Sequence, residues 1–125
     1  MGYRSEIGLC LDASAQAQLE AGLLKLANEK GAANASTEMD PIQGLFQSAE
    51  LRKDEDSGSA AYYWPSLKWY DDFPEVRFIE SFLQELDEGV YLFIRLGESD
   101  DDTEIKGAFW DNPLQMSMIR TITFD

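Results

Sequence analysis

Histidine is absent from this 125-residue sequence, and cysteine occurs once, at Cys10. Without histidine the chain lacks the usual general base, the Ser-His-Asp triad and the most common zinc ligand. One cysteine cannot form a disulfide within the chain, and no histidine is present to activate its thiol. The sequence therefore predicts a protein that is not an enzyme and that holds neither a metal nor a cofactor.

Long apolar runs are also missing. No stretch approaches the roughly 18 residues that a membrane span needs, and the opening "MGYRSEIGLCLD" lacks the apolar core of a signal peptide. The chain has 125 residues, 44% of them hydrophobic, which suits one domain with one core. We expect a single cytosolic domain, residues 1–125, that does not contact a membrane.

Positive charge is scarce, because 10 lysines and arginines stand against 24 acidic residues, for a net charge of −14. Residues 71–125 hold 14 acidic and 4 basic residues, so most of the excess lies in the C-terminal part. Such a surface repels a phosphate backbone, so we expect no direct binding to nucleic acid. A basic protein surface would instead be attracted. The alternative is that the acidity serves only solubility.

Periodic apolar segments predict the secondary structure. Residues 74–87 are the clearest helix, because Ile79, Phe82 and Leu86 share one face and Pro74 suits a first helical turn. The other expected helices are residues 15–31 and 41–51, and the expected strands are residues 3–11, 60–72, 90–97, 103–110 and 117–124.

The order of these segments predicts an α+β fold, with an antiparallel or mixed sheet of about four to five strands and two main helices packed on one face. Pro65 interrupts the aromatic strand 60–72, which indicates a sheet edge or a bulge. Side chains alternate along strand 90–97. We expect Tyr91 and Phe93, together with Trp110, to lie on the face away from the helices and to be only partly covered.

The most unusual segment is "RLGESDDDTEIKG", residues 95–107, in the turn between two expected strands. Its spacing fails the EF-hand pattern for calcium, because the sixth position counted from Asp100 is Ile105 instead of glycine. Two interpretations remain, a solvated turn or a surface for a basic partner. The residues proposed for partner binding are Glu98, Asp100, Asp101, Asp102 and Glu104, with Asp71, Asp72, Asp87 and Glu88 as a second row.

A second unusual segment, "YYWPSLKWYDDFP", contains six aromatic residues. Tyrosine and tryptophan dominate the hot spots of protein interfaces, so Trp64, Trp69 and Tyr70 are candidates for a docking surface. The alternative is that most of these rings belong to the core. Stacking on nucleic-acid bases is disfavoured, because Lys68 is the only basic residue nearby.

Three strings, "MGYRSEI", "KWYDDFPEVRFIESFLQELD" and "LFIRLGE…DDTEIKGAFWDNP", resemble a family of small acidic proteins of tailed phages and prophages. The resemblance spans most of the chain except residues 30–60. It implies a phage or mobile-element context and a location in the host cytoplasm, and it transfers no catalytic residue. Short phage accessory proteins often bind and block host machinery, and some acidic ones imitate DNA.

Two functions are consistent with these features. The first is a phage-type acidic binding protein that blocks a host nucleic-acid-handling protein, of the defence type, by occupying its basic surface as a DNA mimic. The second is a structural or interaction protein that docks or forms a homodimer through its aromatic surface, with acidity only for solubility.

Overall fold

The computed structural model describes the backbone of residues 2–33, 39–99 and 101–118. In chain order the elements are β1 (Ser5–Leu11), α1 (Ala13–Ala33), α2 (Met39–Ser48), β2 (Glu50–Lys53), β3 (Ala60–Leu67), α3 (Pro74–Gln84), the short 3-10 helix η1 (Glu88–Val90), β4 (Tyr91–Leu96) and β5 (Thr103–Gly107).

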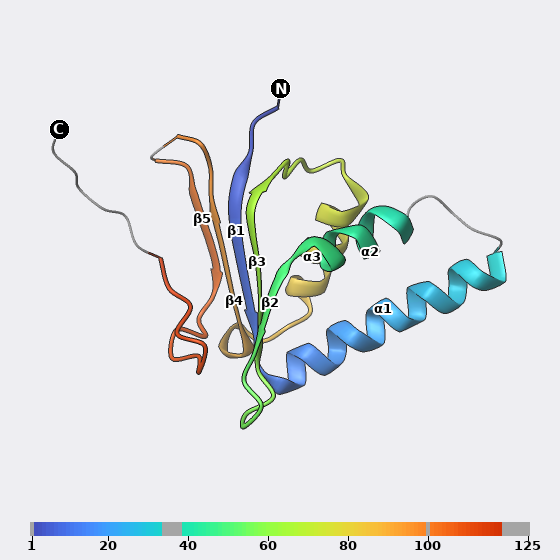
Figure 1. The fold of residues 1–125 in the computed structure, drawn as a ribbon, viewed down its shortest axis with the longest axis horizontal. Coiled ribbons are helices and arrows are strands. Elements are labelled where there is room, and N and C mark those ends of the chain that lie inside the picture. The colour runs from blue at the N-terminus through green and yellow to red at the C-terminus, as the bar shows by residue number, and fades with distance from the viewer. Residues whose placement is uncertain (1, 34–38, 100, 119–125) are drawn as a thin grey trace, which may run out of the picture.

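The five strands form one sheet in the order β2-β3-β1-β4-β5, and every neighbouring pair is antiparallel. Figure 1 shows α1, α2 and α3 on one side of this sheet and the chain after β5 on the other side. We call these two sides the helix face and the open face, and we call residues 108–118 the C-terminal segment. The predicted α+β architecture is confirmed, with three helices instead of two on the covered face.

The helix face holds the larger core. Ile7 and Leu9 of β1 are fully buried there, and Trp64 of β3 and Phe93 of β4 lie beside them. Trp64 also donates a hydrogen bond from its indole Nε1 to the carbonyl oxygen of Leu45 in α2, over 2.8 Å. Burying an aromatic ring removes a large apolar area from water, and the hydrogen bond satisfies its polar atom. Helix α2 is therefore attached to the sheet by both packing and a directional bond.

Helix α3 begins at Pro74, as predicted, and buries Val76, Ile79 and Leu83. Phe82, which we expected in the core, is only partly buried at its margin. The helix ends at Gln84, three residues earlier than expected. Its end is tightened because the N–H groups of residues 85 and 86 each bond to the carbonyl three residues earlier, at 3.2 and 3.1 Å.

Strand β3 continues through Pro65, where the sequence indicated an edge or a bulge. The pairing of β1 with β3 shifts register here, since Ile7 faces Trp64 while Ser5 faces Leu67. An extra residue on one strand is how a bulge accommodates a residue that cannot donate to the ladder. The bulge prediction is therefore confirmed.

Two strand predictions differ from the structure. Strand β2 was not expected, because its residues, 50–53, were divided between a predicted helix and a charged turn. The predicted strand 117–124 is not formed at residues 117 and 118, and its remainder lies outside the described residues.

The faces of β4 are also reversed relative to the prediction. Tyr91 and Phe93 are buried in the core of the helix face, whereas Leu92 and Ile94 point to the open face. Trp110 is 47% exposed, in agreement with the expectation for that residue. Alternation along a strand predicts which residues share a face, but the face that the helices cover depends on where the chain crosses over.

Gly107 directs the chain from β5 onto the open face. Its φ is +84°, and a Cβ at this position would lie 2.2 Å from the carbonyl oxygen of Tyr91. Only glycine fits such a conformation and such a close approach without strain. The C-terminal segment then covers Cys10, Leu92 and Ile94 with side chains that include Leu114 and Met116.

Candidate functional site

Acidic side chains gather at the two ends of the sheet. At the upper end in Figure 1, β4 turns into β5 and β3 leads toward α3; at the lower end, β2 turns into β3 and η1 enters β4. The six residues of β4 alone separate these ends by about 20 Å. We call Glu98, Asp101, Asp71 and Asp72 the upper acidic end, and Asp54, Glu55, Asp56, Asp87 and Glu88 the lower acidic end.

Arg95 neutralises part of the acidic turn. Its guanidinium group donates to the carboxylate of Asp102 at 2.8 and 3.2 Å and to Glu104 at 3.0 Å. It also donates to Ser5 Oγ at 3.1 Å. The hydrogen bonds with Asp102 are the largest cause that raises the pKa of Arg95, and burial opposes them. Asp102 and Glu104 were both predicted to face a partner, but the protein's own arginine already binds them.

Lys106 extends this ion-pair network toward α3. Its Nζ lies 3.3 Å from Glu104 Oε2 and 3.7 Å from Glu80 Oε2, and 5.9 Å from the centre of the Phe93 ring. Each of these three carboxyl and amino groups is about one third exposed, so each pair contributes modestly. The network serves mainly to hold β5 against β4 and α3.

The N-terminal residues bind the rest of the turn. The Tyr3 hydroxyl donates to Asp102 Oδ2 at 2.7 Å and accepts from the N–H of Ser99 at 3.0 Å. The backbone N–H of Arg4 donates to Glu98 Oε2 at 2.5 Å. Asp101 is exposed, and Asp100 lies outside the described residues. The described part of the turn is therefore held by hydrogen bonds, and its most exposed carboxylates are those of Glu98 and Asp101.

The second predicted row of acids is divided between the two ends. Asp71 and Asp72 are exposed and follow Tyr70, whose hydroxyl accepts a 2.8 Å hydrogen bond from the backbone N–H of Tyr3. This bond brings them to the same end as Glu98. Asp87 and Glu88 are exposed at the opposite end, next to the start of β4. The predicted acids consequently do not form one continuous surface.

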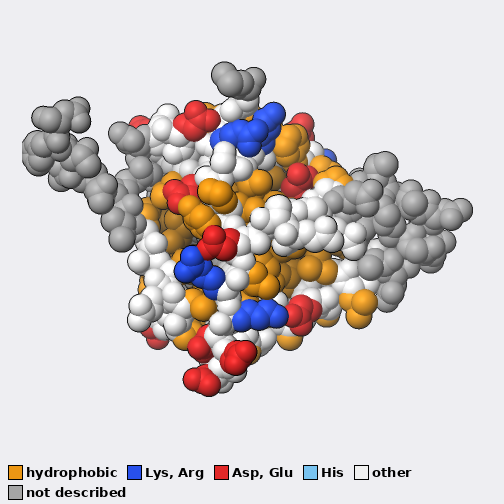
Figure 2. All heavy atoms as spheres, in the orientation of Figure 1, with side chains coloured by type: hydrophobic (Ala, Val, Ile, Leu, Met, Phe, Trp, Pro, Cys, Tyr) orange, Lys and Arg blue, Asp and Glu red, His pale blue; other side chains and the backbone are white. Residues whose placement is uncertain are grey.

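Sequence analysis missed the acids of the β2–β3 hairpin. Asp54, Glu55 and Asp56 stand in the turn that joins these strands, and Figure 2 shows red side chains clustered at this lower end of the molecule. The signal was present in the string "RKDEDSGS", residues 52–59, which was not selected as a candidate site. Its proximity to Asp87 depends on the sheet order, because β3 and β4 both start at this end.

The aromatic surface is largely absent. Trp64 has only 2% of its surface exposed and belongs to the core, so it cannot contact a partner. Trp69 is partly buried and packs its ring 5.7 Å from the Phe93 ring. Tyr70 is partly buried against Phe73, with 5.2 Å between ring centres. The three aromatic residues proposed for docking therefore contribute mainly to folding, and the core interpretation of this segment describes them better.

Trp69 has one unusual feature. Its indole Nε1 is buried without a hydrogen-bond partner among the described residues. Trp64, by contrast, uses the same atom to bond Leu45. A buried N–H group without a partner costs about 1 to 3 kcal/mol of stability. Trp69 is therefore a less favourable core residue than its neighbour.

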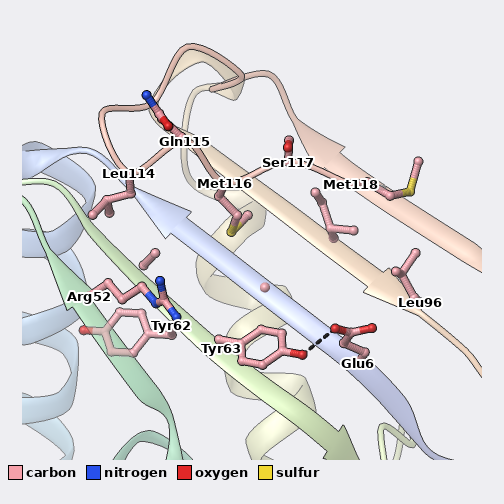
Figure 3. A pocket seen from close by; sticks show the side chains of 13 residues that line it. Glu6, Arg52, Tyr62, Tyr63, Leu96, Leu114, Gln115, Met116, Ser117 and Met118 are labelled. Atoms are coloured by element: carbon pink, nitrogen blue, oxygen red, sulfur yellow. Dashed lines mark hydrogen bonds between the residues drawn. The ribbon is translucent and has the colours of Figure 1, made fainter. Parts of the chain in front are cut away.

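A groove of about 480 Å³ lies on the open face, between the C-terminal segment and strands β1, β3 and β4. In Figure 3, Tyr63 and Glu6 line one side and are joined by a hydrogen bond, while Met116 and Leu114 line the other. This hydrogen bond is the main cause that raises the pKa of Tyr63 to about 12. The floor includes Gly8, where a Cβ would lie 3.0 Å from the sulfur of Met116.

The lining of this groove is mixed, with a larger apolar than polar share. It combines methionine, leucine and isoleucine side chains with the hydrogen-bonded Tyr63–Glu6 pair and with the polar residues Arg52, Gln115 and Ser117. No group of three or more His, Cys, Asp or Glu side chains that could hold a metal exists in the part of the chain described. The groove can therefore bury an apolar group beside a hydrogen-bonded polar pair.

Cys10 lies beneath the C-terminal segment and is fully buried. Burial is the main cause that raises the pKa of its thiol to about 11, and the charge of Asp12 adds to it. A thiol with such a pKa is almost entirely protonated at neutral pH and is a poor nucleophile. The prediction of an inert, buried cysteine agrees with this environment.

No helix in the described parts of the chain is both long and apolar enough to cross a membrane. No protein-family model, no curated protein and no solved structure matches this chain.

Proposed function

We propose that this protein is a non-enzymatic acidic binding protein that docks on the basic surface of a protein that handles nucleic acid. The observation that carries the proposal is the upper acidic end, where Glu98, Asp101, Asp71 and Asp72 stand around an ordered scaffold. Arg95 and Tyr3 hold that scaffold in place. Carboxylates carried by a backbone that is held in place are more effective than those of a flexible acidic loop, because less conformational entropy is lost on binding.

The chemistry of the partner follows from the charge. A net charge of −14 on 125 residues attracts basic proteins and accelerates their encounter. Duplex DNA carries one charge per roughly 1.7 Å of its axis, so a surface with several carboxylates can occupy a site built for phosphates. The resemblance to small acidic phage proteins suggests that the partner belongs to a host cell and that docking blocks it.

The test uses two variants with equal charge. The first neutralises the upper acidic end with Glu98→Gln, Asp101→Asn, Asp71→Asn and Asp72→Asn. The second neutralises four residues of the lower acidic end, with Glu55→Gln, Asp56→Asn, Asp87→Asn and Glu88→Gln. Each takes the net charge from −14 to −10, so any difference between them reflects position and not total charge. Asp102 is left unchanged because it stabilises the turn through Arg95.

Immobilised protein is incubated with a bacterial lysate at low salt and then washed with rising salt or with duplex DNA. We expect captured proteins that duplex DNA displaces, that salt releases, and that the upper-end variant loses while the lower-end variant retains them. Equal retention by both variants, or capture that neither salt nor DNA reverses, would contradict the proposal. The folded state of each variant is checked by its melting temperature, which is expected to stay the same or rise slightly because repulsion is relieved.

A further inference from the structure

Among the described residues, strand β2 is an edge of the sheet, and its outer side pairs with no other strand. It bonds only to β3, and all four of its residues are exposed. An exposed strand edge presents a row of backbone donors and acceptors that can pair with another strand. Native proteins usually block such an edge. The backbone groups and side chains of an edge that is left exposed therefore indicate which strand could pair with it.

The pairing of β2 with β3 determines which backbone groups point outward. The N–H of Asp54 donates to the carbonyl of Ser59 at 2.9 Å, so these residues form a hydrogen-bonded pair. Hydrogen-bonded and non-bonded pairs alternate along an antiparallel ladder. Arg52 and Ala61 therefore also form a hydrogen-bonded pair, whereas Leu51 and Tyr62 form a non-hydrogen-bonded pair. The N–H and C=O groups of Leu51 and Lys53 consequently face the free edge.

The charged side chains on this edge are complementary to those of a second copy of the same strand. Glu50 and Arg52 share one side of the strand and form an ion pair with 2.5 Å between Oε2 and Nη2, and their side chains are 54% and 69% exposed. If a second β2 pairs antiparallel with Leu51 opposite its counterpart, each Glu50 faces the other copy's Arg52. A register centred on Arg52, in which one strand slides by two residues, would instead place Arg52 opposite Arg52. Charge therefore selects the register centred on Leu51.

We propose that two copies of this chain associate through their β2 strands, antiparallel and centred on Leu51, so that their sheets join across a two-fold axis. The strand carries one acidic and two basic residues, in a protein whose total is 24 acidic against 10 basic. It is a place where two strongly acidic molecules can meet without like-charge repulsion at the contact. Leu51 is 46% exposed, and pairing with its counterpart would cover it. This association is independent of the function proposed above.

The first test places cysteine at two positions of the same strand. In the proposed register, the Leu51 pair has a Cα–Cα distance of about 5.5 Å, within the range of a disulfide. The two Lys53 positions are displaced by four residues, about 13 Å. Under oxidised glutathione we expect the Leu51→Cys variant to form disulfide dimers and the matched Lys53→Cys variant to remain monomeric. Cys10 does not interfere, because it is buried.

The second test exchanges the charges. Arg52→Glu places two glutamates opposite each other, and by sedimentation equilibrium at about 0.15 M salt we expect the dimer Kd to rise about tenfold or more. The double variant Glu50→Arg with Arg52→Glu restores opposite charges with the same net charge as the wild type, and we expect it to recover the dimer. A wild type that stays monomeric at all concentrations, equal crosslinking at positions 51 and 53, or a double variant no better than the single one would overturn the proposal.

Discussion

The two faces of the sheet are stabilised in different ways. On the helix face, buried residues of the three strands β1, β3 and β4 and of three helices pack in one cluster around Ile7, Trp64 and Phe93. On the open face, the described part of the buried cluster is Cys10, Ala61, Leu92 and Ile94, covered by a segment without regular structure. The helix face has therefore to be intact for folding, whereas the open face retains a groove and can change at smaller cost.

The C-terminal segment depends on one side chain more than on packing. Asn112 is 4% exposed, and its amide donates to the carbonyls of Phe109 and Met116 and accepts from the N–H of Met116 at 2.7 Å. These bonds replace the backbone ladder that a sixth strand would have supplied. Local unfolding of such a unit needs less free energy than global unfolding.

The largest expected effect is a core truncation on the helix face. Ile79 has no exposed surface, so Ile79→Ala removes buried methylene and methyl groups and leaves a cavity. We expect a loss of about 2 to 5 kcal/mol in the free energy of unfolding, measured by denaturant titration. The control is Leu24→Ala, at a position that is 63% exposed in α1, with an expected change within about 0.5 kcal/mol. Similar losses in both variants would mean that α3 does not anchor the core.

The two tryptophans test how a buried indole N–H group affects the stability of the helix-face core. Trp64→Phe removes a hydrogen bond to Leu45 and leaves a cavity, and we expect it to cost about 1 to 3 kcal/mol. Trp69→Phe removes an N–H group that has no partner among the residues described, so this gain offsets the lost apolar contacts, and we expect a smaller loss of stability. Thermal unfolding of both variants tests this expectation. A loss of stability in Trp69→Phe that equals or exceeds the loss in Trp64→Phe would contradict it.

The open face is tested by Asn112→Ala. We expect faster modification of Cys10 by a thiol reagent, because the segment that covers it opens more often. The global free energy of unfolding should fall by only about 1 to 2 kcal/mol. The matched control is Asp111→Ala, since Asp111 is exposed in the same turn. If Cys10 reacts only at the rate of global unfolding in both variants, the two faces form one cooperative unit and the contrast between them is wrong.

The smallest effect concerns alkaline pH. The pKa of Cys10 is raised from 9.0 to about 11 in the folded protein, so folding favours the protonated thiol. The associated stability is complete below pH 9 and is lost as the pH rises through 11. The pKa of Tyr63 is raised from 10.0 to about 12, so this residue adds a further loss of stability at higher pH. We expect Cys10→Ala to reduce the slope of stability against pH between 9 and 11, measured by urea titrations; an unchanged slope would exclude Cys10 as its source.

Local patterns predicted the elements whose burial is periodic. Strand β1 and helix α3 start close to the expected residues, because apolar residues at spacings of two and of three to four identify them directly. Strand β2 escaped prediction, since "ELRK" has Leu51 as its one apolar residue, shows no alternation, and becomes a strand only through bonds to β3. Sequence analysis selected acids of both ends and missed those of the β2–β3 hairpin, and it did not predict the division into two ends, because that division depends on the order of the strands.

The sequence by itself determined the fold class, the acidity and the absence of histidine chemistry, because composition and short-range periodicity carry this information. Only the tertiary structure decided that Arg95 binds Asp102 and Glu104, that Trp64 is a core residue, and that β2 is left at a free edge. Each of these depends on strand register and on which face the helices cover. Such contacts join residues whose proximity is set by the packing of whole elements, and no local pattern in the chain encodes them.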